Sequence, residues 1–182
     1  MSNVGKWDGW YRSLDSPWPY GDSESYRIGA EYLEDCDTVE DWGCGAGWFT
    51  RFRTHDCVGI DGSQSPFATR VVDLEEYTSS VDGIFMRHVL EHNYQWSKIL
   101  RNAVRSFRKK LVLAIFTPWS DGETREIAFV DRVGVPDISF RKDDIVEILR
   151  GLHWELIELS SPKTVYGQEH VFLVSKGAGG AG

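Results

Sequence analysis

The sequence predicts an α/β protein built on a mostly parallel sheet, and three observations lead to that prediction. Short apolar runs alternate with helix-like segments along the chain. A short run with β-branched and aromatic residues, Val39–Trp42, leads directly into a turn that carries Gly43, Gly45 and Gly47. The two last runs, His153–Leu159 and His170–Ser175, flank a short polar segment, as in an antiparallel hairpin. Strands that alternate with helices predict a parallel sheet covered by helices on both faces.

Composition sets the class of protein. The chain has 182 residues, 41% hydrophobic and 26% charged, which is typical of a globular protein with a substantial core. No stretch approaches the roughly 18 consecutive apolar residues of a membrane span. No apolar leader is visible, and the three cysteines, Cys36, Cys44 and Cys57, form no C-x-x-C pair. These features predict a cytoplasmic protein without structural disulfides or a zinc site.

The N-terminal segment 1–20 is rich in aromatic residues and prolines, so it is predicted to be an irregular lid rather than a helix. Asp22 or Ser23 caps a predicted helix that runs to about Leu33. A very short helix, about Trp48–Arg53, should follow the glycine turn.

The later elements follow in order. Further strands are predicted at 57–60, 70–73, 81–86 and 110–116, and 62–69 is predicted to be a loop. Helices are predicted over 96–108 and 143–150, the second ended by Gly151. Residues 117–139 look like an insertion near the active site. The elements predict one domain over 1–176, followed by a flexible Gly-rich tail, 177–182.

The glycine turn is the strongest functional signal. Glycines let a ligand approach bare backbone, and the start of the following helix offers unpaired N–H groups. Asp61 ends the second apolar run, where a nucleotide-binding α/β unit places the acceptor for ribose hydroxyls.

A family resemblance rests on four motifs together. These are Glu40-Asp41-x-Gly43-x-Gly45-x-Gly47, then Asp61, then Asp73, and then the run Arg87-His88-Val89-Leu90-Glu91-His92. The pattern resembles class I S-adenosylmethionine-dependent methyltransferases over about residues 20–176. The turn is G-x-G-x-G, not the G-x-G-x-x-G of dinucleotide binding. The resemblance implies a Rossmann-like three-layer sandwich with a seven-stranded, mostly parallel sheet and a C-terminal antiparallel hairpin.

The resemblance also implies a cofactor, S-adenosylmethionine, which leaves as S-adenosylhomocysteine. It assigns Asp41 to the methionine ammonium, Asp61 to both ribose hydroxyls, and Asp73 with Leu74 to the adenine. Arg87 and His88 would stand beside the methionine part and the methyl. The full implied cofactor set is Asp41, Gly43, Cys44, Gly45, Gly47, Asp61, Gly62, Asp73, Leu74, Arg87 and His88.

Several of these residues have a simpler reading. Asp61 before Gly62 is also a common turn, and Asp73 begins an acidic stretch that can be a solvated loop. Asp41 can cap backbone N–H groups of the glycine turn. Cys44 is read as a small residue whose backbone matters rather than as a reactive thiol.

Methyl transfer to a hydroxyl usually needs a base, and His88 and His92 are the predicted candidates. In related methyltransferases the Glu-His of this run is often structural. A metal site would need several converging acids or histidines, and the acids Asp121 and Glu123 in a glycine-containing loop are too few to predict one.

The acceptor is predicted to be a hydroxyl on a sugar, glycan or other small molecule, because the pattern resembles small methyltransferases found with bacterial or phage glycan-assembly genes. The net charge of −8 argues against nucleic acid as the main partner. The chain also lacks the Asn/Asp-Pro-Pro-Tyr/Phe signature of amino-methylating nucleic-acid enzymes. The alternatives are a macromolecular acceptor, or a non-catalytic partner protein that binds the cofactor.

Overall fold

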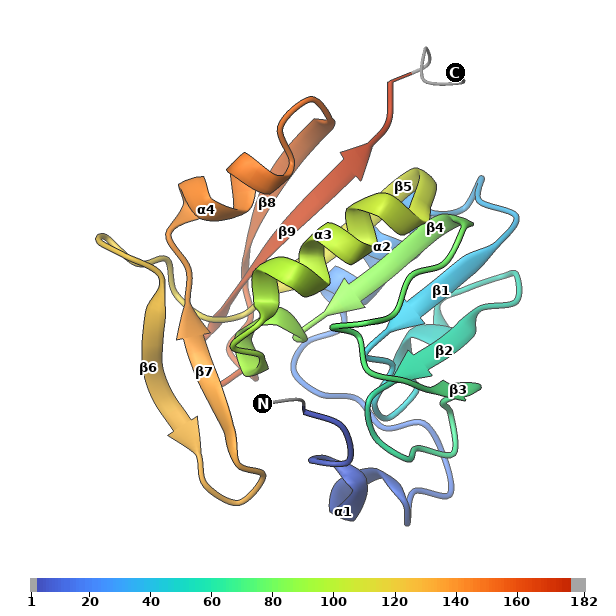
Figure 1. The fold of residues 1–182 in the computed structure, drawn as a ribbon. Helices are drawn as coiled ribbons and strands as arrows, with labels where there is room; N and C mark the ends of the chain where they lie inside the picture. Colours follow the sequence, from blue (N-terminus) through green and yellow to red (C-terminus); the bar gives the residue numbers. More distant parts are fainter. Residues whose placement is uncertain (1–2, 178–182) are drawn as a thin grey trace.

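The structure is a computed structural model that describes residues 3–177. Its main sheet has seven strands in the order β3-β2-β1-β4-β5-β9-β8 (Figure 1). The first five run parallel, while β9 is antiparallel to both β5 and β8. The strands are β1 (Val39–Trp42), β2 (Val58–Asp61), β3 (Arg70–Val71), β4 (Val81–Arg87), β5 (Phe107–Ile115), β8 (His153–Ser160) and β9 (Gln168–Ser175). The predicted fold class and terminal hairpin are confirmed.

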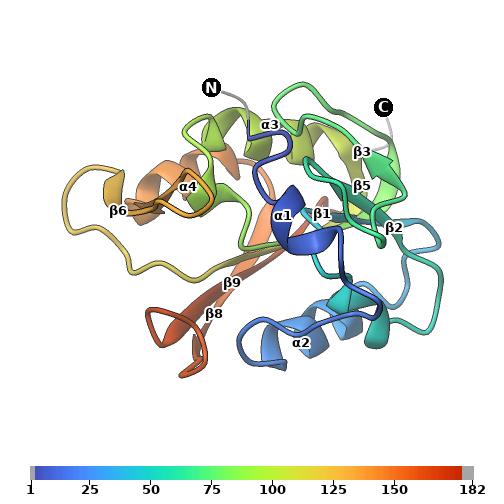
Figure 2. The ribbon, with the colours of Figure 1, turned by 90° about the horizontal axis from the view of Figure 1, so that it is seen from below.

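Helices cover both faces of this sheet, as Figure 2 shows for α2 and α3. One face carries α2 (Glu24–Tyr32) and the short 3₁₀ helix η1 (Trp48–Arg51). The other carries α3 (Trp96–Ser106) and α4 (Lys142–Ile148). The segment 62–69 contains no helix, as predicted from its Gly, Ser and Pro content.

The core consists of two layers because the central strands are buried on both sides. Along β4, Ile84 and Met86 point to the α3 face and Phe85 points to the α2 face. The strand β5 alternates in the same way over Leu111–Ile115. A buried parallel strand therefore reads as a continuous apolar run although its side chains still alternate.

The insertion 117–139 is a β-hairpin. It contains β6 (Arg125–Val130) and β7 (Val135–Ser139), which pair antiparallel and stand to one side of the main sheet (Figure 1). The Thr117 hydroxyl donates to the carbonyl of Ile138 over 2.7 Å, which fixes β7 to the chain after β5. The sequence did not predict these two strands, because the segment contains prolines and mixed charge instead of an apolar run.

The N-terminal segment is also more ordered than predicted. Residues Asp8–Tyr11 form one helical turn, α1, where the sequence predicted no helix. Asp8 lies in the first turn, and its carboxylate accepts a hydrogen bond from Arg12 four residues later, an arrangement that stabilises a helical turn.

Two further findings concern the C-terminal tail and the question of a membrane-spanning helix. The predicted flexible tail lies almost wholly outside the described residues, which end at 177. Across residues 3–177, no helix has both the length and the apolar character needed to cross a bilayer.

Candidate functional site

The candidate site lies at the carboxyl ends of β1, β2 and β4. In the strand order, β1 lies between β2 and β4, so the chain direction of the crossovers reverses there. Ligands of open α/β sheets bind in the crevice at such a switch point. The helical turn α1 lies at this same end of the sheet (Figure 1).

The glycine turn after β1 has left-handed backbone at all three glycines. The φ angles of Gly43, Gly45 and Gly47 are 77°, 47° and 70°. A Cβ atom on Gly43 would lie 2.2 Å from Cγ2 of Val89. The turn therefore needs glycine for its backbone angles and for its close packing.

Asp61 connects this turn to the end of β2. Its Oδ2 accepts the N–H of Gly45 at 2.8 Å, and its Oδ1 accepts the N–H of Ser63 at 2.8 Å. Burial raises the pKa of Asp61, although these N–H groups partly offset the effect. A carboxylate has about four acceptor positions, so two remain for a ligand.

Asp41 is the second buried acid of the site, at the end of β1. Only 4% of its surface is exposed. Burial, together with the nearby charge of Asp61, raises the pKa of Asp41 to about 8. A carboxylate in this state favours a cationic group beside it, because a cation would restore its charged form.

The N-terminal residues 3–20, which we call the strap, lie across this site. The N–H of Gly5 donates to the carbonyl of Gly62 at 2.8 Å, and the N–H of Trp18 donates to the carbonyl of Ala46 at 3.1 Å. The strap therefore contacts the glycine turn itself and the loop that follows β2. At its centre Tyr11 packs on the turn, since a Cβ on Gly45 would lie 2.9 Å from the Tyr11 hydroxyl.

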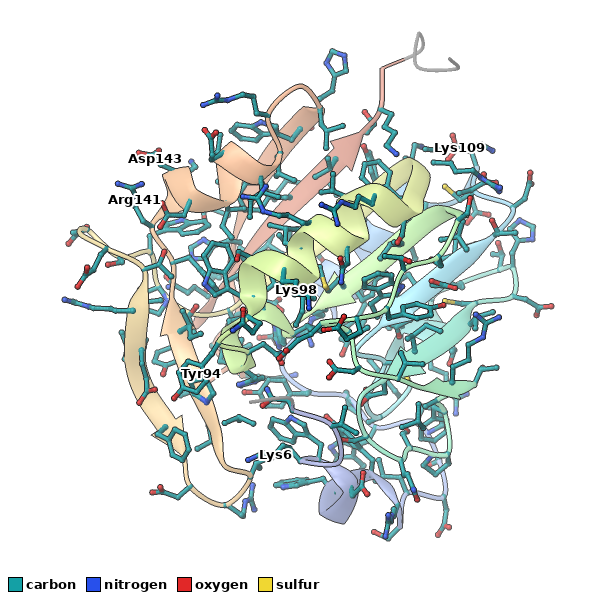
Figure 3. All side chains as sticks on the ribbon, in the orientation of Figure 1. Lys6, Tyr94, Lys98, Lys109, Arg141 and Asp143 are labelled. Carbon is teal, nitrogen blue, oxygen red and sulfur yellow. The ribbon has the colours of Figure 1, made fainter. Side chains whose placement is uncertain are left out.

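The strap also reaches the β6–β7 hairpin. The amine of Lys6 donates to the carbonyl of Gly134 over 3.0 Å, and Figure 3 shows Lys6 beside the turn between the two strands. The guanidinium of Arg132 lies 4.0 Å from the centre of the Trp10 ring, a cation–π contact. Strap and hairpin thus enclose the site from two sides.

At the end of β4, His88 belongs to a buried polar network. Its Nε2 lies 2.6 Å from Glu169 Oε1, which is also 2.7 Å from the Arg87 guanidinium. Burial and the positive charge of Arg87 lower the pKa of His88 to about 3, so the ring is neutral and Nε2–H donates to the carboxylate. The φ of His88 is 56°, which is strained for a non-glycine residue and is often found at functional sites.

Arg87 itself is held by several partners. Its guanidinium donates to the hydroxyls of Ser25 and Tyr26, each at 2.9 Å, besides the ion pair with Glu169. The side chain therefore ties β4 to α2 and β9. These contacts use most of the hydrogen-bond donors of Arg87, the residue that the resemblance assigned to the methionine part of the cofactor.

His92 follows in the 3₁₀ turn η2 (Leu90–His92) and has a different environment. Its Nδ1 lies 3.0 Å from the carbonyl of Pro136 and 3.2 Å from Asp137 Oδ1. Burial lowers the pKa of His92, but the acceptors and charges of Asp137, Glu91 and Pro136 outweigh burial and raise it. The Trp7 ring of the strap packs on the imidazole, with 5.3 Å between ring centres.

The other predicted site residues lie close by but have partners of their own. The Asp73 carboxylate accepts the N–H of Glu75 and closes its own turn. Leu74 is buried in the core on the α3 face, and the Gly62 carbonyl is bonded to the strap. Burial raises the pKa of the Cys44 thiol, which makes it unreactive. Among the described residues, no group of three or more acids, cysteines and histidines is placed to hold a metal ion.

Four residues of the site escaped the sequence analysis. Tyr11 belongs to the aromatic N-terminal segment and Asp137 to the predicted insertion, and no motif marks either residue. Tyr166 and Glu169 come from the final hairpin, far away in the sequence. A charged residue at the start of a strongly apolar strand, as Glu169 is, was the one available signal.

Comparison with solved structures identifies the fold. The chain superposes on 1,6-didemethyltoxoflavin-N1-methyltransferase from Burkholderia thailandensis, bound to its substrate and S-adenosylhomocysteine, with a TM-score of 0.62, 18% identity, and coverage of 85% of this chain and 78% of that one. Magnesium protoporphyrin IX methyltransferase from Synechocystis PCC 6803 with bound S-adenosylmethionine superposes with a TM-score of 0.60 at 16% identity, and the match covers 84% of this chain and 77% of that one.

A third structure, the N-terminal domain of EvdMO1 with S-adenosylhomocysteine and D-fucose, gives a TM-score of 0.57 at 13% identity and covers 90% of this chain and 84% of that one. No protein-family model and no curated protein sequence matches the chain. Because identities this low establish architecture alone, the chain has the Rossmann-like fold of the class I S-adenosylmethionine-dependent methyltransferases.

Proposed function

We propose that the protein is an S-adenosylmethionine-dependent methyltransferase that acts on a hydroxyl of a sugar, a glycan or another small molecule. The observation that carries the proposal is the pair of buried carboxylates, Asp41 and Asp61, on either side of a left-handed glycine turn. A binding site for a nucleoside with a cationic amino-acid arm needs this combination of acceptors and bare backbone.

The residues of the turn fit the cofactor. Gly43 and Gly45 offer backbone without side chains, Asp61 keeps acceptor positions for the ribose hydroxyls, and Asp41 gains its charge beside an ammonium. Cys44, Gly47 and Gly62 would contribute backbone around them, with Asp73 and Leu74 at the adenine end. Because Tyr11 packs on Gly45, binding at this turn would require the ring to move off the glycine turn.

The reaction then depends on alignment and on removal of one proton. The cofactor supplies an activated methyl group. Of the two predicted histidines, His92 is the better base, because its pKa is raised whereas that of His88 falls to about 3. We assign His88 a binding role, in which its buried and unpartnered Nδ1 accepts a hydrogen bond from a ligand.

The small-molecule acceptor is supported by the surroundings of the histidines. The Phe116 ring packs on both His88 and His92, Tyr166 packs on Phe116, and the strap adds Tyr20 beside His88 and Trp7 beside His92. Such an enclosure suits a compact acceptor with a ring better than an extended polymer. The related structures with toxoflavin precursor and D-fucose bound are consistent with that size.

The experiment is a turnover panel. Purified protein is incubated with S-adenosylmethionine and with separate sets of sugars and nucleotide sugars, phenols, nucleotides and peptides, and S-adenosylhomocysteine is quantified by mass spectrometry. We expect product with a hydroxylated small molecule, and its loss in His92→Gln. Product formed exclusively with peptides or nucleic acid would contradict the proposed acceptor class.

A further inference from the structure

We propose that Asp137 and Tyr166 are positioning residues that hold His92 with its Nδ1–H directed into the protein and its Nε2 left free to accept a proton from the acceptor hydroxyl. The inference deepens the proposed function and rests on it, because it assigns the supports of the proposed base. It also gives the β6–β7 hairpin a role, since this insertion carries Asp137 to the site.

The strand β7 supplies both acceptors at one imidazole nitrogen, and the loop between β8 and β9 supports one of them. The Pro136 carbonyl and Asp137 Oδ1, both on β7, lie 3.0 and 3.2 Å from His92 Nδ1. The Tyr166 hydroxyl, from the loop between β8 and β9, donates to Asp137 Oδ2 over 2.9 Å. A neutral imidazole facing two acceptors must carry its proton on Nδ1, and its lone pair is then on Nε2.

The carboxylate is poised to respond when His92 takes up a proton. Asp137 Oδ1 is buried and has no hydrogen-bond partner among the described residues, because Nδ1–H is aligned with the Pro136 carbonyl instead. Burying an acceptor without a hydrogen-bond partner costs free energy. The positive charge of a protonated His92, whose Nδ1 lies 3.2 Å from this oxygen, offsets that cost. The arrangement therefore stabilises the protonated state that a general base reaches during the reaction.

The proton and electron balance is simple. The proton of the acceptor hydroxyl passes to His92 Nε2, and an oxygen lone pair forms the new bond to the methyl carbon. The bond between that carbon and sulfur breaks, and its electron pair stays on sulfur. Asp137 remains a carboxylate throughout, since contacts with His92 and Tyr166 outweigh burial and lower its pKa.

The other charged groups near His92 are few. Glu91, its neighbour in η2, is fully buried, and burial raises its pKa to about 7. Its Oε1 accepts the N–H of Phe116 at 2.7 Å, so it braces the turn rather than the imidazole. His88 is neutral. Asp137 is therefore the charged group from another element that faces His92 directly.

The test measures the imidazole itself, by long-range ¹H–¹⁵N spectra of the full chain over a pH series. The His92 signal is assigned by its loss in His92→Gln. We expect the Nδ1–H tautomer in the wild type, and in Asp137→Asn a proton affinity of His92 about tenfold lower. In Tyr166→Phe, which keeps the charge but frees the carboxylate to rotate away from the imidazole, we expect a smaller loss of His92 proton affinity, with the Nδ1–H tautomer kept by the Pro136 carbonyl.

Asp131→Asn is the matched control, because Asp131 is an exposed carboxylate on the same hairpin. A His92 titration and tautomer unchanged in both Asp137→Asn and Tyr166→Phe would overturn the proposal. Should Asp137→Asn fail to fold, Tyr166→Phe alone decides, since its ring is retained. Calorimetry with S-adenosylhomocysteine on the same wild-type sample distinguishes failure of this inference from failure of the proposed function. If the proposed function is wrong, S-adenosylhomocysteine does not bind, whereas the His92 spectra still report the tautomer and the titration.

Discussion

Asp41 is buried at the carboxyl end of β1, where burial and the neighbouring Asp61 raise its pKa to about 8. Asp41 is therefore protonated at neutral pH. A cationic ammonium beside it would return it to the carboxylate form, so ligand binding and proton release are coupled.

This coupling predicts a pH dependence of binding. Between pH 6 and 7, S-adenosylhomocysteine should bind with release of one proton, and its affinity should rise by about tenfold as the pH rises by one unit. Calorimetry in buffers of different ionisation enthalpy measures that proton. Asp41→Asn should bind more weakly and without the pH dependence, and a flat profile in the wild type would show that Asp41 does not meet the cation.

The ion pair between Arg87 and Glu169 gives a second prediction, at the scale of the elements that it joins. Both side chains are buried, and Arg87 also contacts α2. Glu169→Gln leaves a buried cation uncompensated, which should lower the free energy of unfolding by about 3–5 kcal/mol. Urea unfolding measures the loss, and Glu155→Gln, an exposed acid on the neighbouring strand β8, is the control.

The pH dependence of the stability that Glu169 contributes follows from the direction of its pKa shift. Contacts with His88 and Arg87 outweigh burial and lower the pKa of Glu169 in the folded state. The stabilisation is therefore present above the ordinary glutamate pKa and is lost as the pH falls towards the lowered value. Equal loss of stability in Glu169→Gln and Glu155→Gln would contradict this account.

The strap covers the glycine turn. Because Tyr11 packs on Gly45, the strap and the proposed cofactor would compete for the same backbone. Tyr11→Ala removes this contact, worth about 2 kcal/mol for a buried ring, so S-adenosylhomocysteine should associate roughly tenfold faster or more.

Stopped-flow tryptophan fluorescence measures this rate. Trp10→Ala is the matched control, since Trp10 lies on the same helical turn but packs on Arg132 instead of the glycine turn. Association that is unchanged or slower in Tyr11→Ala would mean that the ring does not block the site.

For the whole molecule, the sequence predicted the sheet well because its signals are local. The strands β4 and β5 contain the apolar runs Ile84–Met86 and Leu111–Ile115, and the glycine turn follows β1 directly. The boundaries of α2, α3 and the final hairpin also agree with the prediction within a few residues.

The site was predicted less completely, because its supports depend on tertiary packing. Asp137, Tyr166 and Glu169 reach the histidines from β7 and the last hairpin, and nothing near them in the sequence indicates that position. The same holds for Tyr11, whose contact with Gly45 depends on how the strap crosses the sheet. Asp61 was predicted as a ligand for ribose, and it also fixes the glycine turn to the loop after β2.

The central claim is that the carboxyl ends of β1 and β2, with the glycine turn, bind S-adenosylmethionine, and calorimetric titration with S-adenosylhomocysteine tests it most directly. We predict binding of one molecule per chain, no binding in Gly45→Val, and a loss of about 2–4 kcal/mol, roughly 30- to 1000-fold in affinity, in Asp61→Ala. Circular dichroism would verify that both variants remain folded. Absence of binding in the wild type, or a loss of less than threefold in Asp61→Ala, would contradict the claim.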